Sequence, residues 1–391
     1  MTKTATSRMT VLFAGGGTGG HLMPGLSVAQ ELRRLHGNRV RAVFAGTDNG
    51  MERGMVEARG FEFAGLPNMR LDRSLLGMPR WAFRSVGGLV GARRLVTRLT
   101  PDVAVSLGGH AALAPSVAAV LAGIPLALME QNAIPGKTNR WLSWWAAEAY
   151  APWPGIEPMF ARPERVRVTG NPIRTELMQR PGREEAAAKF GLDPAKRTLL
   201  VMGGSLGALA VNRAVVDALP HLEAEADRVQ ILHGTGKVSY DEVRAGYEGR
   251  RVRSAVLPFI DDMGAAYAAC DLVLCRAGGT SLAELTALGI PAVLVPLPIA
   301  ANDHQRRNAQ VVAGAGAAMV LEQEDLDGRR LAAFLLNLLD NALCLTRMRA
   351  ASLSLGRPNA AAEIAQRLTD LLPGGPTPVG VPAEAAGIGG T

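Results

Sequence analysis

A strand, a glycine turn, a helix and a second strand follow one another late in the chain, and they constrain the fold more than any other stretch. The apolar run 271–275 is short and bounded enough to be a buried strand. The turn 276–280 contains two glycines, which let the backbone come close to a ligand. The helix that follows ends at Gly289, with Pro291 just beyond it. Residues 292–295 form the second buried strand, so the stretch reads as one unit of a parallel α/β sheet.

Polar residues follow the ends of both strands of this unit. The turn 276–280 follows the first strand, and the cluster Asn-Asp-His-Gln at 302–305 follows the second. Ligands of open α/β sheets sit in the crevice beyond the carboxyl ends of the strands. We therefore expect both clusters to face one ligand-binding crevice.

The alternation of strands and helices extends over most of the chain, which indicates a parallel sheet with crossover helices. A strand, a glycine-rich loop and a helix at 11–35 are echoed at 198–219. The chain is therefore predicted to fold as α/β, in two Rossmann-like units rather than one long sheet. The predicted strands are 10–14, 40–45, 61–65, 102–106, 126–129, 166–169, 198–202, 229–233, 252–257, 271–275 and 292–295.

The first glycine-rich loop ends in a histidine. Gly15, Gly17 and Gly20 match the dinucleotide fingerprint, but the acidic residue expected about 20 residues further on is absent. Such a loop at a helix N-terminus remains a good site for a phosphate or a sugar hydroxyl. His21 has two interpretations. It either hydrogen-bonds to the loop that carries it, or acts as a general base, because its unperturbed pKa lies near 6.5.

Glu284 also has two interpretations. Ser281 and Glu284 fit the S-x-x-E capping box, in which the glutamate only holds the start of a helix. Alternatively, its carboxylate accepts hydrogen bonds from the hydroxyls of a sugar, as in nucleotide sites of this architecture.

The composition is that of a globular protein large enough for two domains: 391 residues, 48% apolar and 20% charged. Cys270, Cys275 and Cys344 are too few for a disulfide framework and are expected to be reduced. Asp261 and Asp262 do not form a D-x-D motif, and no other cluster has metal-ligand spacing, so neither a metal nor a cofactor is expected. The N-terminus lacks the apolar core of a signal peptide.

The net charge of +7 is concentrated in one segment. Residues 70–100 hold seven arginines and one acid, which gives this segment alone a charge of +6. Nucleic acid and an anionic membrane are both candidate partners for such a patch. Trp81, Phe83 and the apolar residues of 74–81, which resemble a surface loop, favour the membrane. The alternative is a helix with its apolar side in the core and its arginines solvated.

A second aromatic group lies further along the chain. Trp141, Trp144 and Trp145 stand beside Lys137 and Arg140. These tryptophans belong either to the same membrane-facing surface or to the core.

Several motifs occur in one order along the chain: G-G-T-G-G-H at 16–21, E-Q-N at 130–132, G-N-P-x-R at 170–174, G-G-S-x-G at 203–207, F-I-D-D-M at 259–263, G-T-S-x-x-E at 279–284 and D-H-Q at 303–305. With them, residues 9–372 resemble the GT-B glycosyltransferases. Within that class they are most similar to the bacterial enzymes that add N-acetylglucosamine to undecaprenyl-diphospho-muramoyl-pentapeptide. Leu206 stands where this family often has glutamine, so no side-chain contact is carried over for it.

The resemblance implies a role for each motif. His21 is the expected catalytic base, with Glu130 and Asp303 as reserves, and Arg174 is a cation beside the diphosphate. The amides of loop 203–207 hold the diphosphate, and the Ile260 backbone reads the uracil edge. The expected substrate-binding residues are Thr18, Gly19, Gly20, Asn132, Arg174, Ser205, Ile260, Gly279, Thr280, Ser281, Leu282, Ala283, Glu284 and Gln305.

The resemblance also implies a domain plan. We expect a flexible N-terminus at 1–8, an acceptor- and membrane-facing domain at 9–170 and a UDP-sugar domain at 171–345. Helices at 346–372 cross back to the first domain, and a disordered tail rich in glycine and proline follows at 373–391.

The expected reaction is an inverting transfer of N-acetylglucosamine from UDP-N-acetylglucosamine to an undecaprenyl-diphosphate-linked muramoyl pentapeptide. It needs no metal, takes place at the cytoplasmic face of the cell membrane on an anionic surface, and involves no nucleic acid. The rivals are a UDP-N-acetylglucosamine epimerase, a transferase with a soluble acceptor, and a nucleotide-binding module without catalysis.

Overall fold

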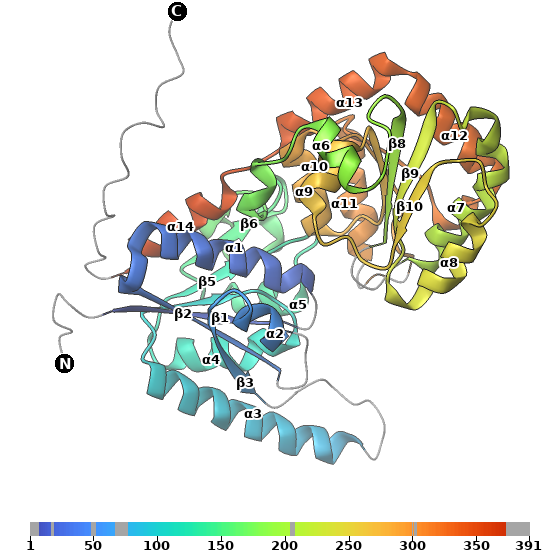
Figure 1. The fold of residues 1–391 in the computed structure, drawn as a ribbon. Helices are drawn as coiled ribbons and strands as arrows, with labels where there is room; N and C mark the ends of the chain where they lie inside the picture. The colour runs from blue at the N-terminus through green and yellow to red at the C-terminus, as the bar shows by residue number, and fades with distance from the viewer. Residues whose placement is uncertain are drawn as a thin grey trace, which may run out of the picture.

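Two α/β lobes make up the protein (Figure 1). The computed structural model describes residues 8–16, 19–47, 52–66, 77–203, 208–298, 300 and 303–372, without the side chains of 19 and 77–86. Each lobe is built around one sheet, and every strand pair in both sheets is parallel. The prediction of two parallel-sheet units is therefore confirmed.

The N-terminal lobe contains the sheet with strand order β3-β2-β1-β4-β5-β6-β7. Its strands are β1 (Met9–Ala14), β2 (Val40–Thr47), β3 (Glu62–Leu66), β4 (Val103–Ser106), β5 (Leu126–Met129), β6 (Glu148–Ala151) and β7 (Val166–Val168). Its helices are α1 (Gly19–His36), α2 (Glu52–Glu57), α3 (Gly77–Leu99), α4 (Leu113–Leu121) and α5 (Lys137–Leu142).

The C-terminal lobe contains the sheet with strand order β10-β9-β8-β11-β12-β13. Its strands are β8 (Arg197–Met202), β9 (Val229–Gly234), β10 (Ser254–Leu257), β11 (Leu272–Cys275), β12 (Ala292–Leu294) and β13 (Ala318–Val320). Its helices are α6 (Arg183–Lys189), α7 (Leu209–Leu222), α8 (Tyr240–Tyr247), α9 (Met263–Ala269), α10 (Gly279–Leu288), α11 (His304–Gly314), α12 (Gly328–Asp340) and α13 (Ala342–Leu355).

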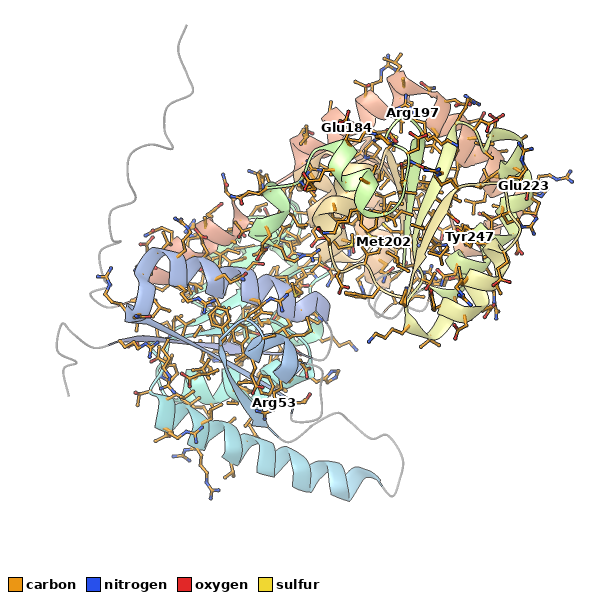
Figure 2. The ribbon with its side chains drawn as sticks, in the orientation of Figure 1. Arg53, Glu184, Arg197, Met202, Glu223 and Tyr247 are labelled. Carbon is orange, nitrogen blue, oxygen red and sulfur yellow. The ribbon has the colours of Figure 1, made fainter. Side chains whose placement is uncertain are left out.

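The strand orders locate a crevice in each lobe. In the first sheet the order reverses between β1 and β4, and in the second between β8 and β11. Loops at such a switch point diverge to opposite faces of the sheet and leave a ligand crevice at the carboxyl ends of the strands. β8 runs from Arg197 to Met202, so its carboxyl end points toward the N-terminal lobe (Figure 2).

The last helix, α14 (Ala360–Asp370), returns to the N-terminal lobe and lies beside α1 (Figure 1). Its apolar face, including Ile364 and Leu368, joins the same core cluster as Leu26 and Leu32 of α1. His36 of α1 also lies 2.9 Å from the Thr369 hydroxyl, between Nε2 and Oγ1. Helix α14 therefore anchors the chain that comes from the C-terminal lobe to the N-terminal lobe by apolar burial.

The eleven predicted strands are all present, with ends within two residues of those predicted. β6 and β13 were not predicted, because β6 carries a glutamate and small alanines and β13 is an edge strand that is only partly buried. One local expectation is wrong in part: residues 77–81 are not a surface loop, since α3 begins at Gly77. Pro79 is tolerated there because the first turn of a helix needs no amide donors.

Candidate active site

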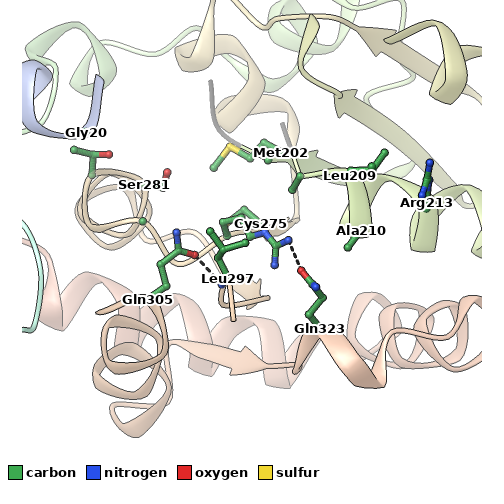
Figure 3. A pocket seen from close by; sticks show the side chains of 15 residues that line it. Gly20, Met202, Leu209, Ala210, Arg213, Cys275, Ser281, Leu297, Gln305 and Gln323 are labelled. Atoms are coloured by element: carbon green, nitrogen blue, oxygen red, sulfur yellow. Dashed lines mark hydrogen bonds between the residues drawn. The ribbon is translucent and has the colours of Figure 1, made fainter. Parts of the chain in front are cut away.

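A cleft between the lobes is lined by residues of both. One hollow of about 640 Å³ and a second of about 440 Å³ share Gly20, Met202, Thr280 and Ser281 on their walls. Gly20 belongs to the start of α1, Met202 ends β8, and Thr280 and Ser281 open α10. Because the two hollows share these lining residues, they adjoin in one cleft at the carboxyl ends of both sheets, and Figure 3 shows the larger hollow.

His21 is in the first turn of α1 and is half-buried. Its Nδ1 atom lies 3.0 Å from the carbonyl oxygen of Leu107 and 2.7 Å from Oε1 of Gln131. Two oxygen acceptors at one ring nitrogen favour the tautomer that carries its proton there. The other nitrogen, Nε2, then keeps its lone pair and can accept a proton when the ring is neutral.

Glu130 is buried and cannot easily serve as the reserve base. Its Oε1 accepts hydrogen bonds from the amides of Gln131 and Asn132 and from Asn132 Nδ2, at 3.0 to 3.3 Å. Its Oε2 accepts from the Gly136 amide and Asn139 Nδ2, both at 3.0 Å. Five donors on one carboxylate organise the loop 130–136 rather than leave a group free to take a proton.

The loop 130–136 also joins the lobes. Asn308 of α11 is fully buried, accepts from the Ala133 amide at 2.7 Å, and donates to Asn132 Oδ1 at 3.1 Å and to the Ala277 carbonyl at 3.0 Å. A Cβ atom added to Gly279 would lie 2.0 Å from the Gln131 carbonyl oxygen, so only glycine permits this contact. Asn132, which was expected to bind the sugar donor, is therefore part of the junction between the lobes.

Glu284 is not a capping-box residue. α10 begins at Gly279 with Gly278 as its N-cap and no side-chain cap, so Ser281 and Glu284 both lie inside the helix. Glu284 Oε1 instead pairs with Arg174, at 3.1 Å from Nε and 3.0 Å from Nη2, and Oε2 accepts from the Tyr267 hydroxyl at 2.9 Å. Burial and the neighbouring Glu284 carboxylate raise the pKa of Tyr267 well above its usual value, so Tyr267 keeps its proton for this bond.

Other predicted residues of the C-terminal lobe take different positions. Ile260 is buried and lines the smaller hollow together with Glu284. Gln305 lines the larger hollow, and its Oε1 accepts from the Leu297 amide at 3.0 Å (Figure 3). Leu282 and Ala283 are buried in apolar clusters, and neither lines the two hollows.

Asp303, the other reserve base, lies at the start of α11 in a left-handed conformation, with φ of 55°. Its carboxylate is half-exposed and lies 3.4 Å from Arg306. Thr18 and Ser205 lie outside the described residues. Among the residues that are described, no three His, Cys, Asp or Glu side chains come together as a metal site.

Comparison with known proteins matches both lobes to one family. Residues 11–151 match the N-terminal domain of glycosyltransferase family 28, and residues 198–368 match its C-terminal domain. A UDP-N-acetylglucosamine–N-acetylmuramyl-(pentapeptide) pyrophosphoryl-undecaprenol N-acetylglucosamine transferase of Anaeromyxobacter dehalogenans is 43% identical over 373 residues, 93% of each chain. The chain belongs to glycosyltransferase family 28. The protein of the same name from Syntrophus aciditrophicus is 39% identical over 90% of this chain and 96% of its own.

Solved structures of family 28 and beyond share this architecture. MurG of Acinetobacter baumannii is 30% identical, with a TM-score of 0.73 over 93% of this chain and 99% of its own. A UDP-N-acetylglucosamine 2-epimerase has a TM-score of 0.66 over 93% of this chain and 95% of its own, but at 16% identity it shares the fold alone. The predictions of a GT-B fold and of a UDP-N-acetylglucosamine-dependent glycosyltransferase are confirmed.

Three residues in or beside the cleft were missed by sequence reasoning about the site: Tyr267, which lines it, and Gln131 and Asn308, which are buried where the lobes meet. Each acts on a partner far away in the sequence, at separations of 110, 17 and 176 residues. The sequence could have pointed to Gln131, because it lies inside the E-Q-N motif. Nothing in the sequence marks Tyr267 or Asn308 as a site residue, since each is a polar residue on an ordinary helix.

Proposed function

We propose that this enzyme transfers N-acetylglucosamine from UDP-N-acetylglucosamine, with inversion, to an undecaprenyl-diphosphate-linked N-acetylmuramoyl pentapeptide. The names of relatives about 40% identical over nine-tenths of the chain support the substrates. The observation that carries the reaction is the cleft itself. Gly20, which directly precedes His21 on α1, lines one wall, and Thr280, Ser281 and Glu284 of α10 line the other.

His21 is the proposed base. The acceptor hydroxyl attacks the anomeric carbon of the donor sugar, the bond from that carbon to the diphosphate breaks, and UDP leaves. Nε2 of His21 takes the hydroxyl proton, because Nδ1 is held by Leu107 and Gln131. A positioned base of this kind contributes about a hundredfold or more to the rate.

The C-terminal lobe, within 171–345, is the proposed donor domain. Glu284 accepts from the ribose hydroxyls and the Ile260 backbone reads the uracil edge. The N-terminal amides of α10 from Gly279 to Ser281, together with Arg174, stabilise the negative charge that develops on UDP. Loop 203–207, most of which lies outside the described residues, is proposed to hold the diphosphate with Ser205. No step of this scheme requires a metal.

The N-terminal lobe, within 9–170, is the proposed acceptor and membrane-facing domain. Trp141, Trp144 and Trp145 are 49%, 57% and 47% exposed, so they are not core residues. Lys137 and Arg140 are exposed beside them on α5. Among the described residues no single helix is long and apolar enough to cross a membrane, although α12 taken together with 342–370, bent by 83°, passes that test of length and composition.

Transfer of radiolabelled N-acetylglucosamine to extracted lipid acceptor tests the proposal. Label in the lipid fraction, dependent on His21, supports it. Epimerised UDP-sugar without lipid labelling supports the epimerase, and label in a water-soluble product supports a soluble acceptor. Binding of UDP-N-acetylglucosamine with no turnover of the sugar supports the remaining rival, a nucleotide-binding module without catalysis.

A further inference from the structure

Gln131 is buried at the point where the two lobes meet, and its amide is oriented by its surroundings. Its Nε2 donates to the Met129 carbonyl at 2.9 Å, so its Oε1 is the atom that faces His21. The main-chain nitrogen of Gln131 donates to Glu130 Oε1 at 3.0 Å. Both ends of this residue are therefore fixed before any substrate binds.

The same residue touches the donor lobe. Its carbonyl oxygen is the atom that a Cβ on Gly279 would approach to 2.0 Å, and Gly279 is the first residue of α10. The next residues, Asn132 and Ala133, are tied to Asn308. Gln131 is thus in contact with the proposed base on one side and with the proposed donor helix on the other.

We propose that Gln131 is a positioning residue for the transfer reaction. It holds His21 as the tautomer protonated at Nδ1, so that Nε2 faces the cleft with a free lone pair. It also fixes the distance between that nitrogen and the N-terminus of α10. This inference rests on the proposed function, in which His21 is the base.

The Leu107 carbonyl offers a competing explanation for the His21 tautomer, because it also lies 3.0 Å from Nδ1. This main-chain oxygen could hold the proton on Nδ1 without Gln131. Two points favour Gln131. Its contact with Nδ1 is shorter, at 2.7 Å, and it links His21 to the donor lobe, which the Leu107 carbonyl does not.

Three variants separate these explanations. Gln131→Met keeps the volume and removes the acceptor. Gln131→Glu keeps an acceptor and adds a negative charge, which raises the pKa of an adjacent imidazole. Gln366→Met is the matched control, because Gln366 is exposed on α14 and its side chain donates to Asp370 of the same helix.

We expect Gln131→Met to lower kcat about tenfold or more, with the affinity for UDP and the KM for UDP-N-acetylglucosamine within twofold of the native values. Gln131→Glu should recover much of the rate and move the acid limb of the kcat–pH profile to higher pH. Other charged groups could also affect this pH profile: Glu52, His110 and Glu130 lie on the elements around His21, and the Arg174–Glu284 pair lines the cleft. All of them are unchanged in both variants, so a difference between the profiles comes from residue 131.

Nitrogen NMR of the histidine-labelled protein, with His21→Ala to assign the signal, reads the tautomer without turnover. The native protein and Gln131→Glu should show a protonated Nδ1, and Gln131→Met a mixture of tautomers. Native kcat in Gln131→Met, or an unchanged tautomer in that variant, would assign the role to the Leu107 carbonyl and overturn the inference. A folded native protein that transfers no sugar but shows the expected tautomers rejects the proposed function and not the role of Gln131 at His21.

Discussion

At the scale of single residues, Glu284 lines the cleft with both carboxylate oxygens already in contact with side chains. Arg174 and Tyr267 hold its two oxygens at 3.0 and 2.9 Å. Replacing Glu284 with alanine should weaken UDP binding about ten- to a hundredfold, because hydrogen bonds to a charged acceptor contribute roughly 1.5–3 kcal/mol. Titration calorimetry with UDP measures this. Unchanged affinity in Glu284→Ala, with a lower Tm, would mean that the carboxylate only supports Arg174 and Tyr267.

His21 should behave differently from Glu284. Replacing His21 with alanine should lower kcat by about a hundredfold or more and leave UDP affinity nearly native, since its contacts are with Leu107 and Gln131. Steady-state kinetics and UDP titration on the same preparation separate the two effects. A near-native rate would move the base to Asp303, because the buried Glu130 already accepts five hydrogen bonds.

Sequence reasoning identified His21 and Glu284 but could not resolve what they contact. The S-x-x-E pattern suggested a helix with Ser281 as its N-cap, yet the N-cap of α10 is Gly278, three residues earlier. The partners of both residues come from other elements: Gln131 for His21, and Arg174 and Tyr267 for Glu284. Local pattern predicts which residues are polar at a strand end, but tertiary packing decides which of them meet.

At the scale of elements, the loop 130–136 and helix α11 form the junction of the lobes. Asn308→Ala removes one donor group and one acceptor and leaves the Ala133 amide without its partner. A buried polar group left unpaired costs about 1–3 kcal/mol. We expect a lower Tm and a reduced kcat in Asn308→Ala, measured by calorimetry and by sugar transfer.

The control for this variant is Asn337→Ala, because Asn337 is exposed on α12 in the C-terminal lobe. It should change neither property. If Asn308→Ala lowers Tm but keeps full kcat, the junction stabilises the fold without setting the geometry of the reaction.

Elements were predicted well wherever burial left a clear pattern. Strands such as β5 and β11 read as short apolar runs because they are covered on both faces. β6 and β13 escaped because edge or near-edge strands need not be apolar throughout; β6 begins with Glu148, which pairs with Arg167 and Arg367. The reversal of strand order at β1 and β4 could not be read from sequence, since it depends on which strands pair.

At the scale of the whole molecule, the first prediction concerns metal. The described residues gather no three-residue metal cluster, and the proposed leaving-group stabilisation uses helix amides and Arg174. Sugar transfer should therefore persist in excess chelator. Loss of activity in chelator that is restored by magnesium or manganese would reject this account of UDP departure.

The last prediction concerns the proposed membrane-facing surface of the N-terminal lobe. On α3, Leu95 and Val96 are buried while Arg93 and Arg94 are exposed, so this half of the helix is partly core and partly a basic surface. The side chains of Trp81 and Phe83, at its other end, lie outside the described ones. α4 packs against both α3 and α5, and Trp141 on α5 and Trp144 and Trp145 just after it are exposed.

Vesicle flotation measures this binding. Each basic residue near an anionic surface contributes about 1 kcal/mol, and partly inserted aromatic rings add to it. Binding should rise with anionic lipid, fall with salt, and fall again in Trp144→Ala/Trp145→Ala and in Trp81→Ala/Phe83→Ala. Leu343→Ala is the control, because Leu343 is 62% exposed on α13.

Equal recovery of the protein on neutral and anionic vesicles would show that electrostatic attraction does not contribute to this binding. Unchanged vesicle binding of both double variants would show that neither aromatic group inserts into the membrane. Native sugar transfer by both variants on the same vesicles would mean that the acceptor enters at another surface.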